Sequence, residues 1–421
     1  MRIKNGKQIC GFSLITLLVR MIGNNSVRSL PLSTLLAINN LFKEGKVTKV
    51  NEKYFFNSFM PPFPGEAFDR LIKNIHLLKI GIGVPISTFI AVTNQCYYDC
   101  WHCSYHSRVN DKILNIEELK NLINELQKLG CTMIGLTGGE PLLREDIAEI
   151  ISLIDHRSAS ELFTTGYNLT FQKAKELKKA GLTYPVISLD HYKKQIHDKL
   201  RRYDGAYEIA LEAIKIFREL GFYVVVTFAP TRDMVRDNKA LNTYFDFVNS
   251  IGVDEVRVAS PSLSGKLLGK EEERFSEEEM EHLCLIQGYY NKKRNYTKIS
   301  SFPLYESKRQ FGCGAGFHHC FVDHAGNVCP CDVSPLSFGN IRKKTFSEIY
   351  QLLQKYFYLP GVTCYSYTTK EQVMDKFQGT LPLSEIDSIS IVNTFPPRPD
   401  TDLPLFYKKI GLKNLPKRER L

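Results

Sequence analysis

Three cysteines lie close together in the stretch "NQCYYDCWHCSYH". Cys96, Cys100 and Cys103 are separated by three residues and then by two. Three thiolates can hold a cubane iron–sulfur cluster and leave one of its irons without a protein ligand, and such an open metal position can bind a substrate or a cofactor. The alternative is a structural zinc ion, which needs four closed ligands and could take His102 or His106 as the fourth.

Small or polar residues follow three further segments that are typical of buried strands. The segments are "CTMIGLT", "ASELFTT" and "YPVISLD". At or just after their ends stand Gly138, Gly139, Glu140, Thr165, Gly166, Ser188 and Asp190. Glycines let a backbone approach a ligand closely, and a carboxylate can accept a hydrogen bond from an ammonium group. Singly, each position is ordinary for a turn. Together around one cysteine loop, they favour a ligand site over a zinc staple.

Six strand–helix units in succession must position these residues. Strands are predicted in "PISTFIAVT", "CTMIGLT", "ASELFTT", "YPVISLD", "YVVVTFA" and "VDEVRVAS", and helices with apolar residues at three- and four-residue spacing follow them. This alternation predicts a parallel sheet covered by helices. Six units fall short of a closed eight-unit barrel, so the sequence predicts an α/β fold, a partial (β/α)6 barrel similar to a TIM barrel, over residues 84–300. The polar strand ends should meet at the carboxyl edge of the sheet.

C-x3-C-x2-C after the first strand, paired with "GGEP" after the second, resembles the radical S-adenosylmethionine (radical SAM) superfamily. The resemblance covers about residues 84–300. It implies a [4Fe–4S] cluster on Cys96, Cys100 and Cys103, with S-adenosylmethionine on the fourth iron. It further implies reductive cleavage of that cofactor to a 5′-deoxyadenosyl radical that abstracts a hydrogen atom from a substrate. An external electron donor such as ferredoxin or flavodoxin is expected.

The same resemblance assigns further positions to cofactor binding. Gly138, Gly139 and Glu140 match the family's motif for the methionine amino group. Thr165, with Gly166 after it, matches the segment near the ribose.

A second set of positions follows from the resemblance. Ser188 and Asp190 match an S-x-D pattern after the fourth strand. "HDKLRRYDGAYE" is similar to an H-D-x-x-R-G stretch, and the planar fork of Arg201 suits the cofactor carboxylate. Arg202 stands where the family commonly has glycine. His102 occupies a position that is often aromatic and near the adenine.

A second group of cysteines follows the barrel. The stretch "VDHAGNVCPC" predicts a hairpin, and "FSEIY" predicts the start of a helix. The pattern resembles the SPASM or twitch extension, which carries auxiliary iron–sulfur clusters. Five cysteines suit one auxiliary [4Fe–4S] cluster, and the expected ligands are Cys313, Cys320, Cys331 and Cys364, with Cys329 competing with Cys320. The alternative is zinc held by four thiolates.

Other segments flank the barrel. Residues 1–80 predict a small α+β unit with a helix in "LPLSTLLAINNLFKEG" and a hairpin in "KVTKVNEKYFFNSF". Residues 301–365 form the cysteine-rich SPASM- or twitch-like extension, and residues 366–421, interrupted by prolines, predict an extended tail. The isolated cysteines fall in apolar patterns and are expected to be buried thiols: Cys10, Cys131 and Cys284.

The unit at residues 1–80 has three candidate roles. It could grip a peptide by β-augmentation. Its apolar helix, from Gly11 to Ile22, could instead lie on an anionic membrane surface. It could also be a lid or a packing domain. We slightly favour a peptide substrate, with a lipid or another small molecule as alternatives. The apolar run is too short to span a bilayer and lacks a small-residue cleavage site, so we expect a cytoplasmic enzyme, with membrane-surface association as the alternative.

Composition agrees with an intracellular metalloenzyme. The chain has 421 residues, 11 cysteines and a formal charge of +10. Clustered cysteines in so long a chain predict metal sites in a reducing compartment. We attribute the charge to a solvated surface and expect no nucleic-acid partner, because no aromatic residues interleave with the basic C-terminal stretch. Two other classes compete: an iron–sulfur electron carrier or redox sensor that does not cleave the cofactor, and a zinc-stapled binding protein. The polar residues around the cysteine loop argue against the electron carrier, which has no ligand to bind there.

Overall fold

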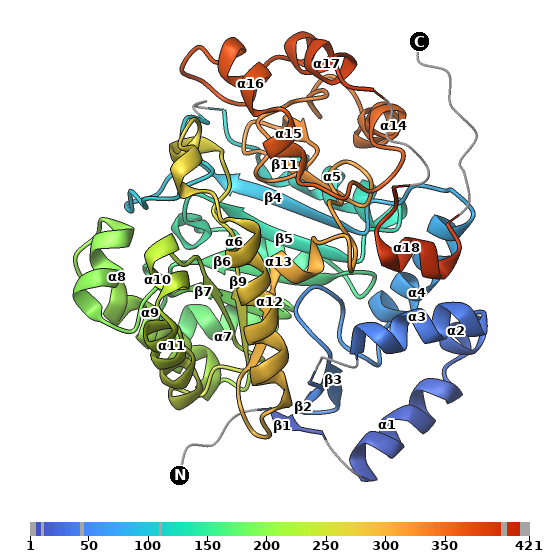
Figure 1. Ribbon diagram of the computed structural model, residues 1–421, viewed down its shortest axis with the longest axis vertical. Helices are drawn as coiled ribbons and strands as arrows, with labels where there is room; N and C mark the ends of the chain where they lie inside the picture. Colours follow the sequence, from blue (N-terminus) through green and yellow to red (C-terminus); the bar gives the residue numbers. More distant parts are fainter. Residues whose placement is uncertain (1–5, 10–11, 43–45, 109–111, 397–401, 413–421) are drawn as a thin grey trace.

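A nine-stranded sheet forms the centre of the molecule (Figure 1). The computed structural model describes residues 6–9, 12–42, 46–108, 112–396 and 402–412. The strand order is β10-β9-β8-β7-β6-β5-β4-β11-β12. Neighbours pair in parallel from β10 to β11, and β11 pairs antiparallel with β12. The strands are β4 (Ser87–Thr93), β5 (Met133–Gly138), β6 (Ala159–Thr164), β7 (Tyr184–Ser188), β8 (Val225–Phe228), β9 (Glu255–Val258), β10 (Lys298–Ser301), β11 (His319–Val322) and β12 (Val328–Cys329).

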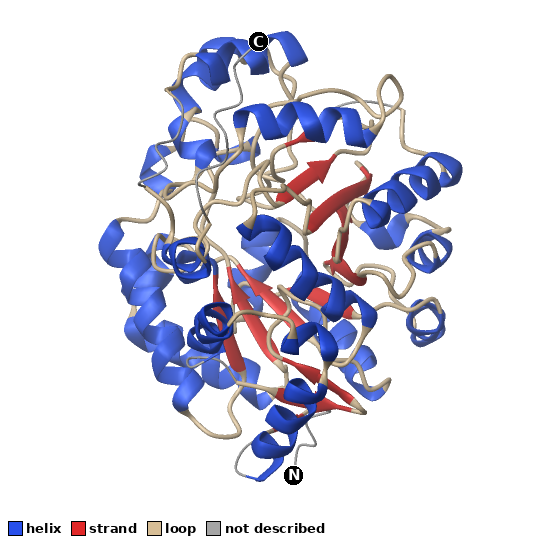
Figure 2. Ribbon diagram, turned by 90° about the vertical axis from the view of Figure 1, so that its right-hand side faces the viewer, coloured by secondary structure: helices blue, strands red, loops and turns tan. Residues whose placement is uncertain are grey.

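Helices follow the strands in alternation, which confirms the predicted α/β partial barrel. Figure 2 shows them on the outer side of the sheet. They are α5 (Ile116–Lys128), α6 (Ile147–Ser152), α7 (Phe171–Lys179), α8 (Lys194–Arg201), α9 (Ala206–Glu219), α10 (Arg232–Arg236), α11 (Asn238–Ser250) and α12 (Glu277–Lys292). The helix α5 illustrates why they form: Asn115 and Glu118 make a capping box, and Leu119, Leu122 and Leu126 bury one face.

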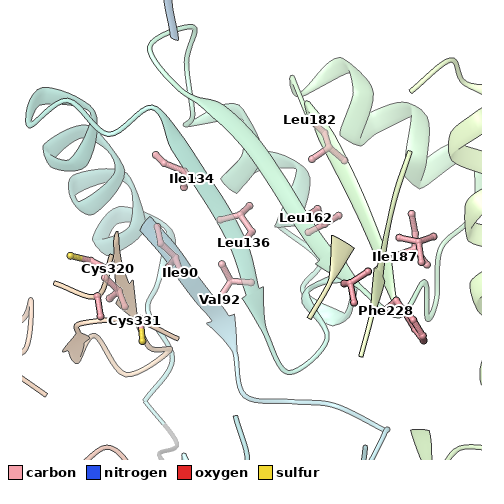
Figure 3. Packing of buried hydrophobic residues seen from close by; sticks show 14 of the residues in the cluster. Ile90, Val92, Ile134, Leu136, Leu162, Leu182, Ile187, Phe228, Cys320 and Cys331 are labelled. Atoms are coloured by element: carbon pink, nitrogen blue, oxygen red, sulfur yellow. The ribbon is translucent and has the colours of Figure 1, made fainter. Parts of the chain in front are cut away.

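The main core lies between these helices and the outer face of the sheet. Figure 3 shows Ile90, Ile134, Leu136 and Leu162 from successive strands packed in one layer. The strand β10 is a seventh parallel strand that the sequence pattern did not predict. Its four residues, "KISS", are mostly polar, so they carry no apolar run that would indicate a buried strand.

The inner face of the sheet holds a buried charged network. Arg257 and Glu161 form an ion pair with both side chains at most 2% exposed. The Nε of Arg257 donates to Oγ of Ser58 at 2.6 Å, and that hydroxyl donates to Oε1 of Glu255 at 2.9 Å. The hydroxyl of Tyr223 donates to the other oxygen of Glu255 at 2.9 Å. Ser58 therefore fastens the N-terminal segment inside the barrel.

The N-terminal unit closes the amino-terminal end of the barrel. It contains β1 (Lys7–Gln8), α1 (Phe12–Gly23), α2 (Asn25–Arg28), α3 (Leu32–Phe42), β2 (Thr48–Val50), β3 (Lys53–Phe55) and α4 (Glu66–Lys79). The predicted hairpin is present as β2 and β3. Phe55 stacks on Tyr223 with ring centroids 4.5 Å apart, and it packs with Met133 and Tyr184, the first residues of β5 and β7. The described residues include no helix long and apolar enough to cross a membrane.

Lys298 in this region gives a pH-dependent prediction. Its Nζ donates to the carbonyl of Phe55 at 3.2 Å and to the hydroxyl of Tyr223 at 3.2 Å. Burial lowers the pKa of its ammonium group to about 8, against the opposing charges of Glu255 and Asp254. An unfolded lysine titrates near about 10.4, so the unfolded chain binds more protons between those values. The free energy of unfolding, relative to that of Lys298→Met, should therefore rise from about pH 8 to about pH 10. Urea unfolding of both proteins across this range checks it, and a flat difference would contradict it.

The C-terminal region differs from the extended tail expected for residues 366–421. After α13 (Phe302–Tyr305) and α14 (Phe346–Tyr356), it contains α15 (Tyr365–Thr368), α16 (Lys370–Lys376), α17 (Glu385–Asn393) and α18 (Leu405–Ile410). Figure 1 shows α18, in red, beside α3 and α4, in blue. Phe406 and Ile410 share a core with Phe68, so the end of the described chain packs against its beginning.

The isolated cysteines follow the prediction where the structure describes them. Cys131 and Cys284 are buried. Cys10 lies outside the described residues.

Candidate active site

The three cysteines of the first cluster lie in the loop after β4, at the carboxyl edge of the sheet. Cys96 is exposed, Cys103 is half-buried and Cys100 is buried. Cys96 borders a cavity of about 460 Å³, lined by Asn94, Gln95, Cys96, Tyr97 and Leu143, so its thiol is accessible although protein surrounds it. Burial, together with the charges of Glu140, Cys100 and Cys103, raises the pKa of Cys96 to about 12.

The thiols thus influence the pKa of one another, as expected for three ligands of one cationic centre. Thiolates that lie this close repel one another unless a metal centre offsets their charge. The donor set therefore fits an iron–sulfur cluster held by Cys96, Cys100 and Cys103. Within the described part of the chain, no group of three or more histidine, cysteine or acidic side chains is arranged to ligate a single metal ion.

The glycine pair at the end of β5, Gly138 and Gly139, is pressed against the residues that precede Cys96. The N–H of Gly139 donates to the carbonyl of Thr93 at 2.8 Å, and the N–H of Glu140 donates to that of Gln95 at 2.7 Å. A Cβ on Gly138, whose φ is +127°, would lie 2.2 Å from the carbonyl oxygen of Thr93. A Cβ on Gly139 would lie 2.0 Å from that of Gln95. Only glycine permits this approach.

Glu140 is 1% exposed and is saturated by internal donors. Its carboxylate accepts from the N–H of Leu142 at 3.0 Å and the hydroxyl of Thr164 at 2.6 Å. It also accepts from the N–H of Thr165 at 2.7 Å and the hydroxyl of Thr165 at 2.6 Å. Burial raises the pKa of this carboxyl group, although the four hydrogen bonds lower it. The contacts show Glu140 joining the ends of β5 and β6, and its expected bond to the cofactor amine stays a prediction.

Asp190 and Arg201 form a buried ion pair behind the cysteine loop. The carboxylate of Asp190 lies 2.7 Å from Nη2 of Arg201, and Nη1 of Arg201 donates to Sγ of Cys100 at 3.6 Å. Burial opposes ionisation of Asp190, but the nearby charge of Arg201 favours it, and the pKa of Asp190 lies below the usual range. Arg201 thus already has two partners, so its expected contact with the cofactor carboxylate stays a prediction.

His102 and Ser188 complete the expected rim. Ser188 is the last residue of β7, at the same edge as the cysteine loop. Burial lowers the pKa of His102 to about 4, so its ring is neutral at pH 7. The ring lies edge-on to that of Trp101, with centroids 5.2 Å apart and planes at 71°.

Four tyrosines around the loop were missed by the sequence analysis. Tyr98 stacks on Tyr203, with centroids 4.4 Å apart and planes at 19°. Tyr167 lies edge-on to Tyr203 at 5.8 Å and contacts Tyr97 at 5.1 Å. Each of them stands in or beside a motif already singled out, in "QCYYDC", "TTGYN" and "RRYDG". That recurrence was the available signal, and the rings pack as an aromatic cluster beside the cysteine loop.

The second group of cysteines separates into two sets. Cys313, Cys331 and Cys364 border one cavity of about 1230 Å³. A hydrogen bond with Cys313 raises the pKa of Cys364, and burial raises it further. Cys320 belongs to the main core together with Cys313 and Cys331 (Figure 3), but it is fully buried, does not border this cavity and has Cys131 and Cys329 as its neighbouring thiols. The structure therefore brings three of the four expected ligands together, and the place of Cys320 among them stays a prediction.

Comparisons with known proteins agree with this geometry. Residues 90–243 match the model of the radical SAM superfamily, and residues 313–357 match that of an iron–sulfur cluster-binding domain, SPASM.

Two curated relatives and one solved structure illustrate the similarity. AdoMet-dependent heme synthase of Methanosarcina barkeri is 27% identical over 285 residues, 62% of this chain and 80% of the relative. PqqA peptide cyclase of Bradyrhizobium diazoefficiens is 25% identical over 275 residues, 62% of this chain and 71% of the relative. The structure of Streptococcus suis SuiB bound to S-adenosylmethionine superposes with a TM-score of 0.56 at 14% identity, over 76% of this chain and 81% of that one, and it supports the fold.

Proposed function

Because the chain is a radical SAM enzyme with a SPASM iron–sulfur domain, we propose that Cys96, Cys100 and Cys103 hold the cluster at which S-adenosylmethionine is cleaved. When bound, these cofactors supply a 5′-deoxyadenosyl radical for hydrogen abstraction from an unactivated C–H bond. The observation that carries the proposal is the placement of the three coupled thiols against the glycine pair, at the carboxyl edge of the sheet. Ferredoxin or flavodoxin is the proposed source of the electron.

The other residues at the carboxyl edge of the sheet fall into two sets: those that would contact the cofactor and those that hold the contacting residues in place. We assign His102, Gly138, Gly139, Thr165 and Ser188 to the cofactor surface. Glu140 supports that surface from behind by joining two strand ends, while Asp190 and Arg201 hold the cysteine loop through Cys100. Such support keeps ligands within the narrow geometry that a reaction requires.

The substrate is proposed to bind in the cavity of about 1230 Å³. One wall is apolar and comes from the N-terminal unit, including Leu30 and Ile72; another contains Phe89 of the barrel interior and Ser262. Ser262 lies three residues before Gly265, where an added Cβ would be 2.2 Å from the carbonyl oxygen of Cys103. The cavity thus leads from the N-terminal unit towards the cysteine loop. Its size exceeds that of an ordinary small-molecule pocket, commonly about 300–1,000 Å³.

The charges of the cavity favour a neutral or cationic substrate. Carboxylates outnumber permanent cations in its lining: Glu277, Glu278, Glu281, Asp332 and Asp402 face Arg274, Lys308 and Arg309. Two other acids of the lining add little charge, because Glu161 pairs with Arg257 and burial raises the pKa of Glu306 to about 8. A negative potential of this kind repels polyanions. We therefore propose a peptide with neutral or basic side chains, in line with the similarity to a peptide cyclase. The similarity to heme synthases supports a haem precursor as the second candidate.

Iron content and cofactor cleavage test the reaction together. Anaerobically reconstituted protein should hold about eight irons per chain, from two cubanes, and should form 5′-deoxyadenosine with dithionite and S-adenosylmethionine. The variant with Cys96, Cys100 and Cys103 all replaced by alanine should keep about four irons and form none. Cys131→Ala, which removes a thiol from the core, is the matched control and should behave as the wild type. Zinc in place of iron, without cleavage, would instead indicate a zinc-stapled binding protein.

The substrate class has a separate test. Basic or neutral peptides, an acidic peptide and a haem precursor would each be added at equal concentration while 5′-deoxyadenosine formation is followed. The charge argument predicts that a basic or neutral peptide stimulates the rate. When that peptide is deuterated at carbon, its deuterium should appear in 5′-deoxyadenosine. Stimulation by the haem precursor alone would reject the peptide proposal and leave the radical reaction intact.

A further inference from the structure

Glu306 stands directly after α13, and its side chain lines the same large cavity as three cysteines. The residue is exposed where it lines the cavity, and the protein around it still raises the pKa of its carboxyl group by desolvation. Its N–H donates to the carbonyl of Phe302 at 2.8 Å, which anchors its backbone to α13. Among the residues that the structure describes, no hydrogen bond or ion pair engages the Glu306 carboxylate.

The carboxylate of Glu306 lies within electrostatic range of the thiols. After burial, the charge of Cys313 is the largest influence that raises the pKa of Glu306. The charge of Glu306 in turn contributes to the raised pKa values of Cys331 and Cys364. A carboxyl group without a partner and three thiols on one cavity wall can lose their protons when a cationic metal centre binds to them. These four side chains therefore have the donor chemistry of a metal centre.

A backbone bridge positions Cys313 relative to the segment that contains Cys364. Cys313 forms a two-way bridge with Gly361: its N–H donates to the carbonyl of Gly361 at 2.7 Å, and the N–H of Gly361 donates back at 2.9 Å. This bridge fixes Cys313 beside the segment that leads to Cys364. Cys320 and Cys329 do not line the cavity, and Sγ of Cys329 already accepts from Nη1 of Arg108 at 3.5 Å.

We propose that Cys313, Cys331 and Cys364 hold the auxiliary cluster and that the Glu306 carboxylate occupies the position left open on its fourth iron. The inference relies on the proposed function only for the presence of an auxiliary cluster. A carboxylate is a harder ligand than a thiolate and suits iron in a cluster less well. Glu306 is therefore an exchangeable ligand, facing the cavity from which a substrate group can replace it. Cys320 becomes a core thiol.

The ligand set can be tested without cofactor cleavage. In a protein with Cys96, Cys100 and Cys103 replaced by alanine, the auxiliary site alone should bind about four irons. Adding Cys313→Ala, Cys331→Ala or Cys364→Ala should lower the iron and sulfide per chain at least twofold. Adding Cys320→Ala should leave both unchanged. Loss of iron in the Cys320 variant, or its retention in the Cys364 variant, would overturn the ligand set.

Spectroscopy tests Glu306 itself. In the same background, Glu306→Gln should retain iron but change the Mössbauer signal of about one iron in four. Glu306→Ala should bind imidazole, detected as nitrogen coupling in pulsed EPR of the reduced cluster, at least tenfold more tightly than the parent. Glu281→Gln is the matched control, since Glu281 borders the cavity but pairs with Arg309, and it should leave both signals unchanged. Spectra of the Glu306 variants identical to the parent's would overturn the assignment, while cofactor cleavage by the full protein would still stand.

Discussion

Replacing Gly139 by alanine should abolish cluster binding and lower 5′-deoxyadenosine formation at least about a hundredfold. The new Cβ would lie 2.0 Å from the carbonyl oxygen of Gln95 and 2.9 Å from the carbonyl carbon of Asn94. Both are backbone atoms just before Cys96, so relief requires the cysteine loop itself to move. A displacement of about 1 Å in a reacting group is enough for a loss of this size.

Iron content and initial rate would be measured on Gly139→Ala and on a matched glycine variant. Gly288 lies inside α12, where an added Cβ meets no atom within 4 Å. Gly288→Ala should keep full iron content and rate, with a gain of up to about 1 kcal/mol in the free energy of unfolding, because alanine favours a helix interior. Wild-type iron and rate in Gly139→Ala would show that the loop tolerates the displacement and would contradict the proposed cofactor surface.

Replacing Arg257 by methionine should lower the free energy of unfolding by about 3–5 kcal/mol. Arg257 is 1% exposed, pairs with Glu161 and donates to Ser58. Its removal leaves the Glu161 carboxylate buried without its cation and frees the N-terminal segment from the barrel interior. Urea unfolding monitored by circular dichroism measures the loss.

Two further variants separate the buried pair from general surface electrostatics. Adding Glu161→Gln to Arg257→Met should restore part of the stability, because the isolated buried charge is removed as well. Glu212→Gln breaks a surface ion pair in which the side chain of Glu212 is 58% exposed and that of Lys215 is 60% exposed. This change should lower the free energy of unfolding by less than about 1 kcal/mol. Equal losses in the Arg257 and Glu212 variants would contradict the role of the network.

The barrel could be predicted because its signals are local. The strands from β4 to β9 carry apolar residues in short runs or at alternate positions, and helices with regularly spaced apolar residues follow in turn, so two short-range periodicities identify the architecture. The strand β10 could not be predicted, because Lys298 and the two serines belong to a polar interior and no apolar run marks them. The helices α16 to α18 escaped because they are short and separated by proline-containing segments, too brief for a period to show.

The sequence by itself determined the chemistry of the site: three thiols at close spacing, a glycine pair with an acid, and polar residues at the strand ends. These features depend on residue type and short spacing, which the chain carries directly. Tertiary structure alone decided the partners. It joined Glu140 to Thr165 and Arg201 to Asp190, and it placed Cys313, Cys331, Cys364 and Glu306 along one cavity that Cys320 does not border. These contacts join segments far apart in the chain, and their approach is set by how the sheet, the helices and the N-terminal unit pack.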